Sequence, residues 1–386
     1  MDNFIFYNPT KLIFGKGQIS HLPTEVLKYG DRVLIVTGKG SIKRSGLYDE
    51  VISLLADKCT IYELEGIDSN PRLTSIREGV RICKENDIEL VLAVGGGSVV
   101  DAAKGIASGA LYDGDVWDFY LRKATIEEAL PIGAVLTLAA TGSEMNGNSV
   151  VTNMDTMEKK GSGSIYQFPS FSILDPCYTF TVPRADTVNG IVDMMAHVFE
   201  QYFSHTTQTP LQDRFCEAIL RTVIENSATV LANPNDYEAR ANLLLSGTFA
   251  LNGLTKLGVE GDWASHAIGH QLSGLYDVAH GAALSIILPH WMRYVMDEGL
   301  DKFKQYAIEV WKLNPEGMTD QELALEGIRR TAEFFESMGA PQRMSEYGIP
   351  ATVIDKMAKR ATEKGPLGSY KKLYYEDVKS ILTNSL

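Results

Sequence analysis

The residues best suited to chemistry in this chain are histidines and one aspartate in its second half. His266, His270 and His280 lie within fifteen positions of one another, and Asp193 and His197 stand four apart in an apolar stretch. Because a spacing of four is about one helical turn, Asp193 and His197 share one face of a predicted helix, as do His266 and His270. A carboxylate and several imidazoles suit Fe(II), Zn(II) and similar ions. The pattern therefore predicts a metal site that could polarise a substrate oxygen.

This spacing does not identify which histidine lies outside the metal's ligand set. An Asp/His pair four residues apart also occurs on protein surfaces and as a hydrogen-bonded pair in a core. Ala267 follows His266, so the glutamate of an HExxH metalloprotease motif is missing. The sequence argues against proteolysis by that route.

A second candidate site is rich in glycine. The segment LVLAVGGGSVVDAAKGIA passes from an apolar strand through Gly95, Gly96 and Gly97 into a helix. Backbone N–H groups at such a turn can bind a diphosphate. Ser98 and Asp101 are three apart, like an N-cap and an N3 acid, so helix capping also explains part of the pattern. The turn matches neither GxGxxG nor GxxxxGK[ST], and neither fingerprint assigns it.

An earlier strand, RVLIVTG at 32–38, also ends in glycine. Gly38, Gly40 and Ser41 lie there with basic side chains close by. An acid at such a strand end would bind a ribose 2′-hydroxyl, whereas small and basic residues leave room for a 2′-phosphate. We therefore expect NADP(H) rather than NAD(H), although a solvated basic loop explains the same residues.

The elements that must position these residues form two different patterns. Up to residue 183, short apolar strands alternate with amphipathic helices, which predicts a doubly wound, mostly parallel α/β domain over 1–183. Beyond it, the pattern predicts an all-helical domain over 184–386, with Asp186 capping its first helix. The expected strands are 32–38, 59–64, 89–97, 131–139 and 171–176, and the expected helices of the second domain include 186–203, 210–231, 236–257, 281–297, 320–338 and 350–363.

Two further segments carry structural expectations. The N-terminal sequence MDNFIFYNPTKLIFGKG has an acid at Asp2 and no basic region, so it predicts two short strands around Asn8 and Pro9 rather than a signal peptide. The stretch KKGSGSIYQ at 159–167 predicts a loop. No apolar run approaches the roughly 20 residues needed to span a bilayer.

Composition excludes some partners. The net charge of -13 opposes the phosphate neutralisation that nucleic acids or anionic membranes require, so neither is expected as a partner. The four cysteines form no CxxC pair. This pattern favours reduced thiols and a cytoplasmic location.

Several motifs together resemble one known family. GGGSVVDAAK at 95–104, LTLAATGSEMN at 136–146, LDPCYTFTVP at 174–183 and the Asp/His pattern are similar to the iron-containing (group III) alcohol dehydrogenases. The resemblance covers nearly the whole chain and is greatest to NADPH-dependent butanol dehydrogenases and aldehyde reductases. It implies a dinucleotide-binding α/β domain, a helical metal-binding domain and a homodimer.

The resemblance also assigns roles to residues. His270 would lie near the substrate and nicotinamide as a catalytic proton-relay residue. The implied ligands of Fe(II), alternatively Zn(II), are Asp193, His197, His266 and His280. The implied NADP(H)-binding residues are Gly38, Gly40, Ser41, Gly95, Gly96, Gly97, Ser98, Asp101, Thr137, Thr141 and Lys159.

The expected activity is reversible, NADP(H)-linked interconversion of small aldehydes such as butanal and primary alcohols. The alternatives are a polyol (glycerol-type) dehydrogenase that also uses a metal and a nicotinamide, a lyase resembling dehydroquinate synthase, and a nucleotide- or metal-responsive binding protein. The lyase would need a strongly basic site for a polyanionic substrate. A small, fairly apolar substrate is favoured by the sequence neighbours of the proposed ligands, which are Met194, Met195, Ile268, Leu272, Leu275 and Trp263.

Overall fold

A computed structural model describes all 386 residues, and the chain forms two compact units. We call Tyr7–Val182 with Asn233–Asn252 the α/β unit, and Met1–Phe6, Pro183–Ala232 and Gly253–Leu386 the helical unit. The predicted fold class, an α/β part followed by a helical part, is confirmed. This partition differs from a single break after residue 183, because the two short segments at 1–6 and 233–252 group with the other unit.

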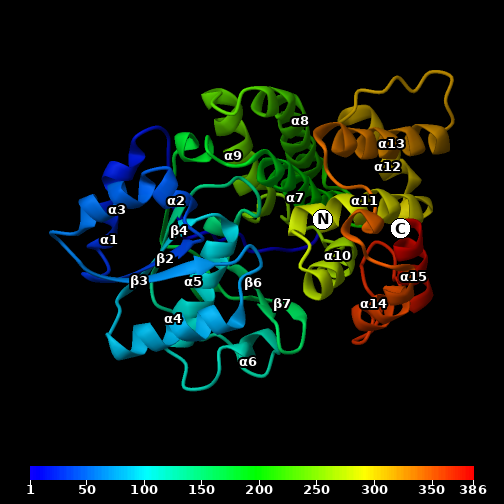
Figure 1. Cartoon of the computed structure of the whole chain (residues 1–386). Coiled ribbons are helices and arrows are strands. Elements are labelled where there is room, and N and C mark those ends of the chain that lie inside the picture. Colours follow the sequence, from blue (N-terminus) through cyan, green and yellow to red (C-terminus); the bar gives the residue numbers. More distant parts are fainter. The chain divides into compact units, whose positions relative to one another are not determined.

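The α/β unit is built on a six-stranded sheet in which every neighbouring pair is parallel (Figure 1). The long apolar runs of the sequence form its central strands, which are buried on both faces. In spatial order the strands are β1 (Lys11–Phe14), β8 (Phe171–Leu174), β5 (Ile132–Leu136), β4 (Leu90–Gly95), β2 (Arg32–Gly38) and β3 (Thr60–Ile67).

Helices cover both faces of this sheet. Alternate residues of β2 enter different cores, Leu34 with the helices α4 and α5, and Ile35 with α1 and α3. Figure 1 shows the α4–α5 pair against the strands. The helices of the unit are α1 (Leu22–Val26), α2 (Ser41–Arg44), α3 (Leu47–Leu55), α4 (Leu73–Glu85), α5 (Gly97–Ala110), α6 (Trp117–Tyr120) and α9 (Tyr237–Leu251).

Three sequence expectations for this unit are wrong. The N-terminal segment forms one strand, β1, and residues 1–10 form none. The predicted loop at 159–167 contains strand β7 (Glu158–Gly163), which pairs antiparallel with β6 (Asn148–Asn153) and is followed by a short 3-10 helix. The strand expected over 131–139 ends at Leu136, because its partner β4 ends at the opposite residue.

The helical unit packs around α7, whose side chains are almost all buried. The helix expected over 236–257 ends at Leu251 and belongs to the α/β unit as α9. No helix of the structure is both long and apolar enough to cross a membrane. The helices of the unit are α7 (Arg184–Tyr202), α8 (Pro210–Ala232), α10 (Ala264–Tyr276), α11 (His280–Val295), α12 (Leu300–Glu309), α13 (Asp320–Met338), α14 (Ile354–Ala361) and α15 (Tyr375–Asn384).

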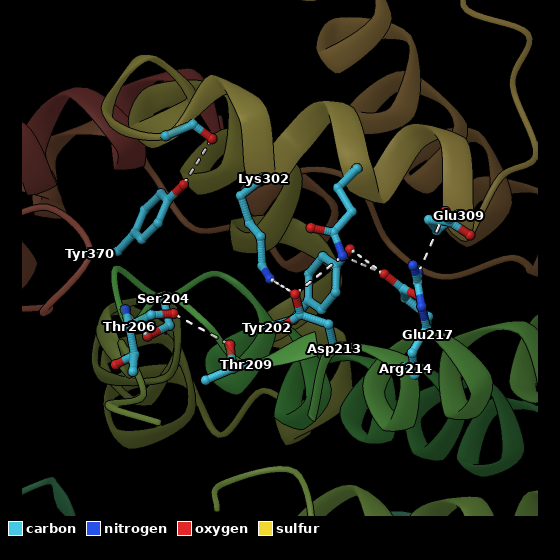
Figure 2. A network of polar contacts seen from close by, with 12 residues as sticks. Tyr202, Ser204, Thr206, Thr209, Asp213, Arg214, Glu217, Lys302, Glu309 and Tyr370 are labelled. Atoms are coloured by element: carbon cyan, nitrogen blue, oxygen red, sulfur yellow. Dashed lines mark hydrogen bonds and ion pairs between the residues drawn. The ribbon is translucent and has the colours of Figure 1, made fainter. Parts of the chain in front are cut away.

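A polar network joins α7, α8 and α12 next to this core (Figure 2). Lys302 of α12 forms an ion pair with Asp213 of α8 at 2.6 Å. Glu217 of α8 has no exposed surface, and it accepts hydrogen bonds from Tyr202 at 3.0 Å and Gln305 at 2.7 Å. Each buried charge of the network has partners that partly offset its desolvation cost, and these contacts link the C-terminal end of α7 to α8 and α12.

Candidate metal centre and nucleotide-binding turn

The helix that carries Asp193 and His197 is α7. It begins at Arg184, with Pro183 before it, and Asp186 makes no capping hydrogen bond, so the predicted cap is wrong. Beyond the first turn nearly every side chain is buried. The apolar residues of this stretch therefore hold Asp193 and His197 inside a core.

Asp193 and His197 meet His266 of α10 and His280 at the start of α11. One possible ligand atom from each residue lies within 4.8 Å of the others. Asp193 Oδ1 is 3.6 Å from His280 Nε2 and 3.8 Å from His197 Nδ1. Two such ligands at about 2.1 Å from one ion stand roughly 3.4 Å apart in tetrahedral geometry. The donor set therefore fits an ion such as Fe(II) or Zn(II) with small adjustments.

Burial keeps an imidazole of this group in the form that binds metal. Desolvation lowers the pKa of His197 well below its ordinary value, and the neighbouring His266 adds to the shift. A neutral imidazole keeps a lone pair for coordination. His266 Nε2 is buried without a hydrogen-bond partner. A buried polar atom of this kind calls for a partner, which a metal ion would supply.

His270 lies outside this group, one helical turn beyond His266 on α10. Its ring centroid is 5.3 Å from that of His280, and the residue is partly exposed. The structure thus gathers Asp193 and three imidazoles around one point and leaves a fourth imidazole beside them. The roles of these five residues stay predictions.

The apolar neighbours expected to face a substrate mostly lie elsewhere. Trp263 is partly exposed, and its ring centroid is 5.2 Å from that of His266. Leu275 is also partly exposed. The other four have no exposed surface and belong to the core of the helical unit, so they do not indicate an apolar substrate: Met194, Met195, Ile268 and Leu272.

A close helix contact brings His280 next to Asp193. A Cβ atom on Gly281, the second residue of α11, would lie 2.0 Å from the carbonyl oxygen of Asn189 on α7. Only glycine permits this approach. Because Asn189 lies one turn before Asp193, we expect the contact to set the distance between the two proposed ligands.

Sequence reasoning missed Glu200, which lies one turn beyond His197 on α7. Its side chain is almost fully buried, and its Oε1 is 2.6 Å from Nδ1 of His266. Positions 193, 197 and 200 follow the i, i+4, i+7 spacing of one helix face, which was the available signal.

In the α/β unit, the carboxyl ends of β2, β4 and β5 lie at one edge of the sheet. β2 pairs with β4 as far as Thr37, and β4 pairs with β5 as far as Gly95. Gly38 and Thr137 follow directly at the same edge. Open α/β sheets bind their ligands outside the carboxyl ends of strands.

The turn between β4 and α5 is too tightly packed for side chains. A Cβ atom on Gly97 would lie 2.2 Å from Thr141 Oγ1, and one on Gly95 would lie 2.6 Å from Val99 Cγ2. α5 begins at Gly97, with Gly96 as its N-cap and no side chain capping it. The first N–H groups of a helix have no intrahelical partner and can bind an anion, so this turn suits a diphosphate.

Ser98 and Asp101 do not cap α5, so the capping interpretation is wrong. Ser98 Oγ donates to a backbone carbonyl in the loop after β3 at 2.5 Å. Asp101 accepts hydrogen bonds from Ser143 Oγ at 2.5 Å and from the backbone N–H of Val150 at 2.9 Å. Burial raises the pKa of Asp101, and the nearby Lys104 partly offsets this shift.

Lys104 was also missed by sequence reasoning. It is fully buried on α5, and its Nζ donates to Ser143 Oγ at 2.8 Å, to the carbonyl of Asn148 at 2.7 Å and to Asn146 Oδ1 at 3.1 Å. Desolvation lowers its pKa to about 8. Lys104 therefore ties α5 to the loop before β6.

The remaining predicted cofactor residues lie on separate elements. Gly40 has a φ of 89°, which favours glycine, and it precedes Ser41, the exposed first residue of α2. Lys159, on β7, donates to Asn70 Oδ1 at 2.9 Å. Their contact with a cofactor stays a prediction.

Two lysines near Gly38 already have acidic partners. Lys39 forms an ion pair with Asp68, and Lys43 forms one with Glu65 at 2.5 Å. Some of the positive charge that the sequence offers to a 2′-phosphate is therefore balanced by carboxylates.

Comparisons with known proteins point to one family of enzymes along the whole chain. A family model described as iron-containing alcohol dehydrogenase matches residues 9–176, and a model of the C-terminal part of the Fe-containing alcohol dehydrogenase family matches residues 187–386. The chain is 52% identical, over 100% of both sequences, to a probable NADH-dependent butanol dehydrogenase 1 of Bacillus subtilis. It is 38% identical to the NADPH-dependent aldehyde reductase YqhD of Escherichia coli, over 95% of this chain and 94% of that protein.

A solved structure of a butanol dehydrogenase has the same fold as this chain. The crystal structure of an NADH-dependent butanol dehydrogenase A from Thermotoga maritima superposes with a TM-score of 0.96 at 42% identity. The superposition covers 99% of this chain and 98% of that one.

Proposed function

The chain belongs to the iron-containing alcohol dehydrogenase family, and from this premise we propose that it interconverts small aldehydes, such as butanal, and primary alcohols by metal-dependent hydride transfer with NADP(H). The observation that supports the proposal is the group formed by Asp193, His197, His266 and His280, whose ligand atoms lie within 4.8 Å of one another. Fe(II) is the proposed ion and Zn(II) the alternative, because both accept this donor set.

When bound, the ion would supply Lewis-acid polarisation of the substrate oxygen, and the nicotinamide would supply or accept the hydride. The chain's own residues would hold the ion and the cofactor and move a proton. The buried, neutral His197 is ready to act as a ligand without first losing a proton. His270, partly exposed beside His280, can move a proton to or from the substrate oxygen. The glycine turn before α5 would bind the cofactor's diphosphate.

Preference for NADP(H) rests on Gly38, where no acidic side chain is present to repel a 2′-phosphate. NAD(H) is the second candidate, because two observations favour it. The Bacillus subtilis relative is named NADH-dependent, and Lys39 and Lys43 are paired with acids in the structure. Initial rates with NADPH and NADH at matched concentrations distinguish the two candidates.

The proposed function is tested on protein purified anaerobically. We expect one Fe(II) or Zn(II) per chain and oxidation of the reduced cofactor with short-chain aldehydes. Asp193→Ala removes a proposed ligand, and it should lose both metal and activity. His290→Ala is the matched control, because His290 is also on α11 but lies outside the metal group. Wild-type protein that holds no metal and oxidises neither cofactor would refute the proposal.

A homodimer and a cytoplasmic location are further parts of the proposal. The N-terminal segment leaves Phe4, Ile5 and Phe6 exposed, and a second copy could cover this apolar surface. Light scattering coupled to gel filtration tests the dimer. All four cysteines are free, which supports a reducing compartment, and cell fractionation tests the location.

A further inference from the structure

We propose that Glu200 is a positioning residue that fixes the ring orientation and tautomer of His266, so that Nε2 of this histidine faces the metal site. The inference rests on the proposed function, because it concerns the ion's ligands. Glu200 would bind neither the metal nor the substrate, and would act only through His266, one of the four proposed ligands.

The first observation is the contact between the two side chains. Glu200 Oε1 lies 2.6 Å from Nδ1 of His266, and both side chains are buried. The carboxylate of Glu200 accepts from backbone N–H groups at both of its oxygens, so it is the acceptor in this contact too, and Nδ1 of His266 carries the proton. A neutral imidazole with its proton on Nδ1 has its lone pair on Nε2.

The second observation is the environment of that Nε2 atom. It is buried without a hydrogen-bond partner, and His266 belongs to the group whose ligand atoms lie within 4.8 Å of one another. Glu200 thus holds one nitrogen of the ring, and the other nitrogen faces Asp193, His197 and His280. Carboxylates that hold a metal-binding histidine in this way fix its orientation and raise its basicity as a ligand.

Other contacts fix Glu200 itself. Its Oε1 also accepts from Ser265 Oγ at 2.5 Å and from the backbone N–H of His266 at 3.3 Å. Its Oε2 accepts from the backbone N–H of Trp263, a residue with a φ of 66° at the start of α10. With donors on both oxygens, the carboxylate cannot rotate without losing several hydrogen bonds.

These same contacts give Glu200 a second role, which a test must separate from the first. The carboxylate caps α10, because it accepts from N–H groups at the N-terminus of that helix. Removal of Glu200 could therefore weaken metal binding simply by loosening the loop before α10.

Asp262 offers a matched control for the capping role. Its carboxylate is also buried at the start of α10, where it accepts from the backbone N–H groups of Ala264 at 2.9 Å, Ser369 at 3.0 Å and Tyr370 at 2.8 Å. These bonds all go to the backbone. Asp262→Ala therefore removes a buried carboxylate from the same loop without removing any atom of the Glu200–His266 contact.

The first experiment measures the affinity of the metal-free full-length protein for Zn²⁺ and Co²⁺ by competition with a chelator. We expect Glu200→Ala to bind both ions about 10- to 100-fold more weakly than wild type. Glu200→Gln keeps one acceptor oxygen and should recover part of the loss, while Asp262→Ala should bind within about threefold of wild type. Wild-type affinity in Glu200→Ala, or an equal loss in Asp262→Ala, would overturn the inference.

The second experiment takes its readout from the wild-type protein and uses a variant only to assign one signal. ¹⁵N chemical shifts of histidine in the metal-free wild-type protein report which nitrogen carries the proton, with His266→Ala used to assign the signal. We expect the proton of His266 on Nδ1, and a proton on Nε2 would overturn the inference. Neither experiment uses aldehyde turnover. If wild-type protein bound neither ion, the proposed function would fail, whereas normal wild-type binding with an Nε2–H tautomer would reject the role of Glu200 alone.

Discussion

Gly281→Ala tests whether the contact between α7 and α11 sets the geometry of the metal site. The new Cβ would lie 2.0 Å from the carbonyl oxygen of Asn189, and its other nearest atoms also belong to the Asn189 backbone. Ordinary contact begins at 3.4 Å, so the first turn of α11 must move away by the difference, 1.4 Å. Metal–ligand distances are held to about 0.2 Å. The movement therefore takes His280 out of reach of an ion held by Asp193.

The expected loss of metal affinity follows from this displacement. Changes in residues that only support a ligand weaken metal binding about 10- to 100-fold. Displacement of a ligand itself should cost about 100-fold or more, equivalent to roughly 2.7 kcal/mol. Overpacking should also lower the free energy of unfolding of the metal-free protein by about 1–3 kcal/mol.

The assay is chelator competition with Zn²⁺ on metal-free protein, together with thermal unfolding. Gly269→Ala is the control, because Gly269 lies on α10 facing α11 and its added Cβ would meet only side chains at 3.5 Å or more. This variant should bind Zn²⁺ like wild type and be slightly more stable, since alanine favours helix. Wild-type Zn²⁺ affinity in Gly281→Ala would show that the contact does not set the ligand distance.

Three other predictions follow from the site. His266→Ala should lose bound metal and activity together, whereas His270→Ala should keep its metal and turn over about 100-fold more slowly; equal metal loss in both variants would contradict the division of roles. Gly38→Asp should shift the ratio of kcat/KM from NADPH toward NADH by at least about tenfold, because a carboxylate repels the 2′-phosphate, and an unchanged ratio would show that Gly38 does not determine the cofactor preference. The pKa of Lys104 is about 8 in the folded protein against an ordinary value of 10.5, so between these pH values the unfolded chain binds more protons. Across this range the free energy of unfolding of wild type should therefore rise relative to Lys104→Met, by up to about 3 kcal/mol. Urea unfolding at several pH values measures this difference, and a flat difference would refute the assignment.

The strands were predictable where the chemistry of one segment decides its structure. RVLIVTG forms β2 with the predicted bounds, because a β-branched run between polar turns has one good structure. The end of β5 was not predictable, because apolar residues continue after Thr137 and only the end of the neighbouring strand stops the ladder. β7 was missed for a related reason. Its glycines and lysines carry no strand signal, and the pairing with β6 supplies the structure.

The metal group shows the same division. Spacing of four along a helix identified Asp193 with His197 and His266 with His270 as pairs. Which histidine lies outside the ligand set depends on how α10 and α11 pack. In the sequence, only the resemblance to a known family indicated that this histidine is His270. Glu200 acts on a residue 66 positions away. No local pattern reports a contact at that separation.

The position of α9 in the chain has a consequence for protein synthesis. Leu244 of this helix enters the core beneath the sheet, and Thr248 donates to the buried carboxylate of Glu144 at 2.5 Å. Both residues leave the ribosome at least seventy positions after the end of β8, the last strand of the sheet. The sheet is therefore fully translated before its own core can be completed. A gene fragment that stops at residue 183 would encode every strand and still leave Glu144 without this partner.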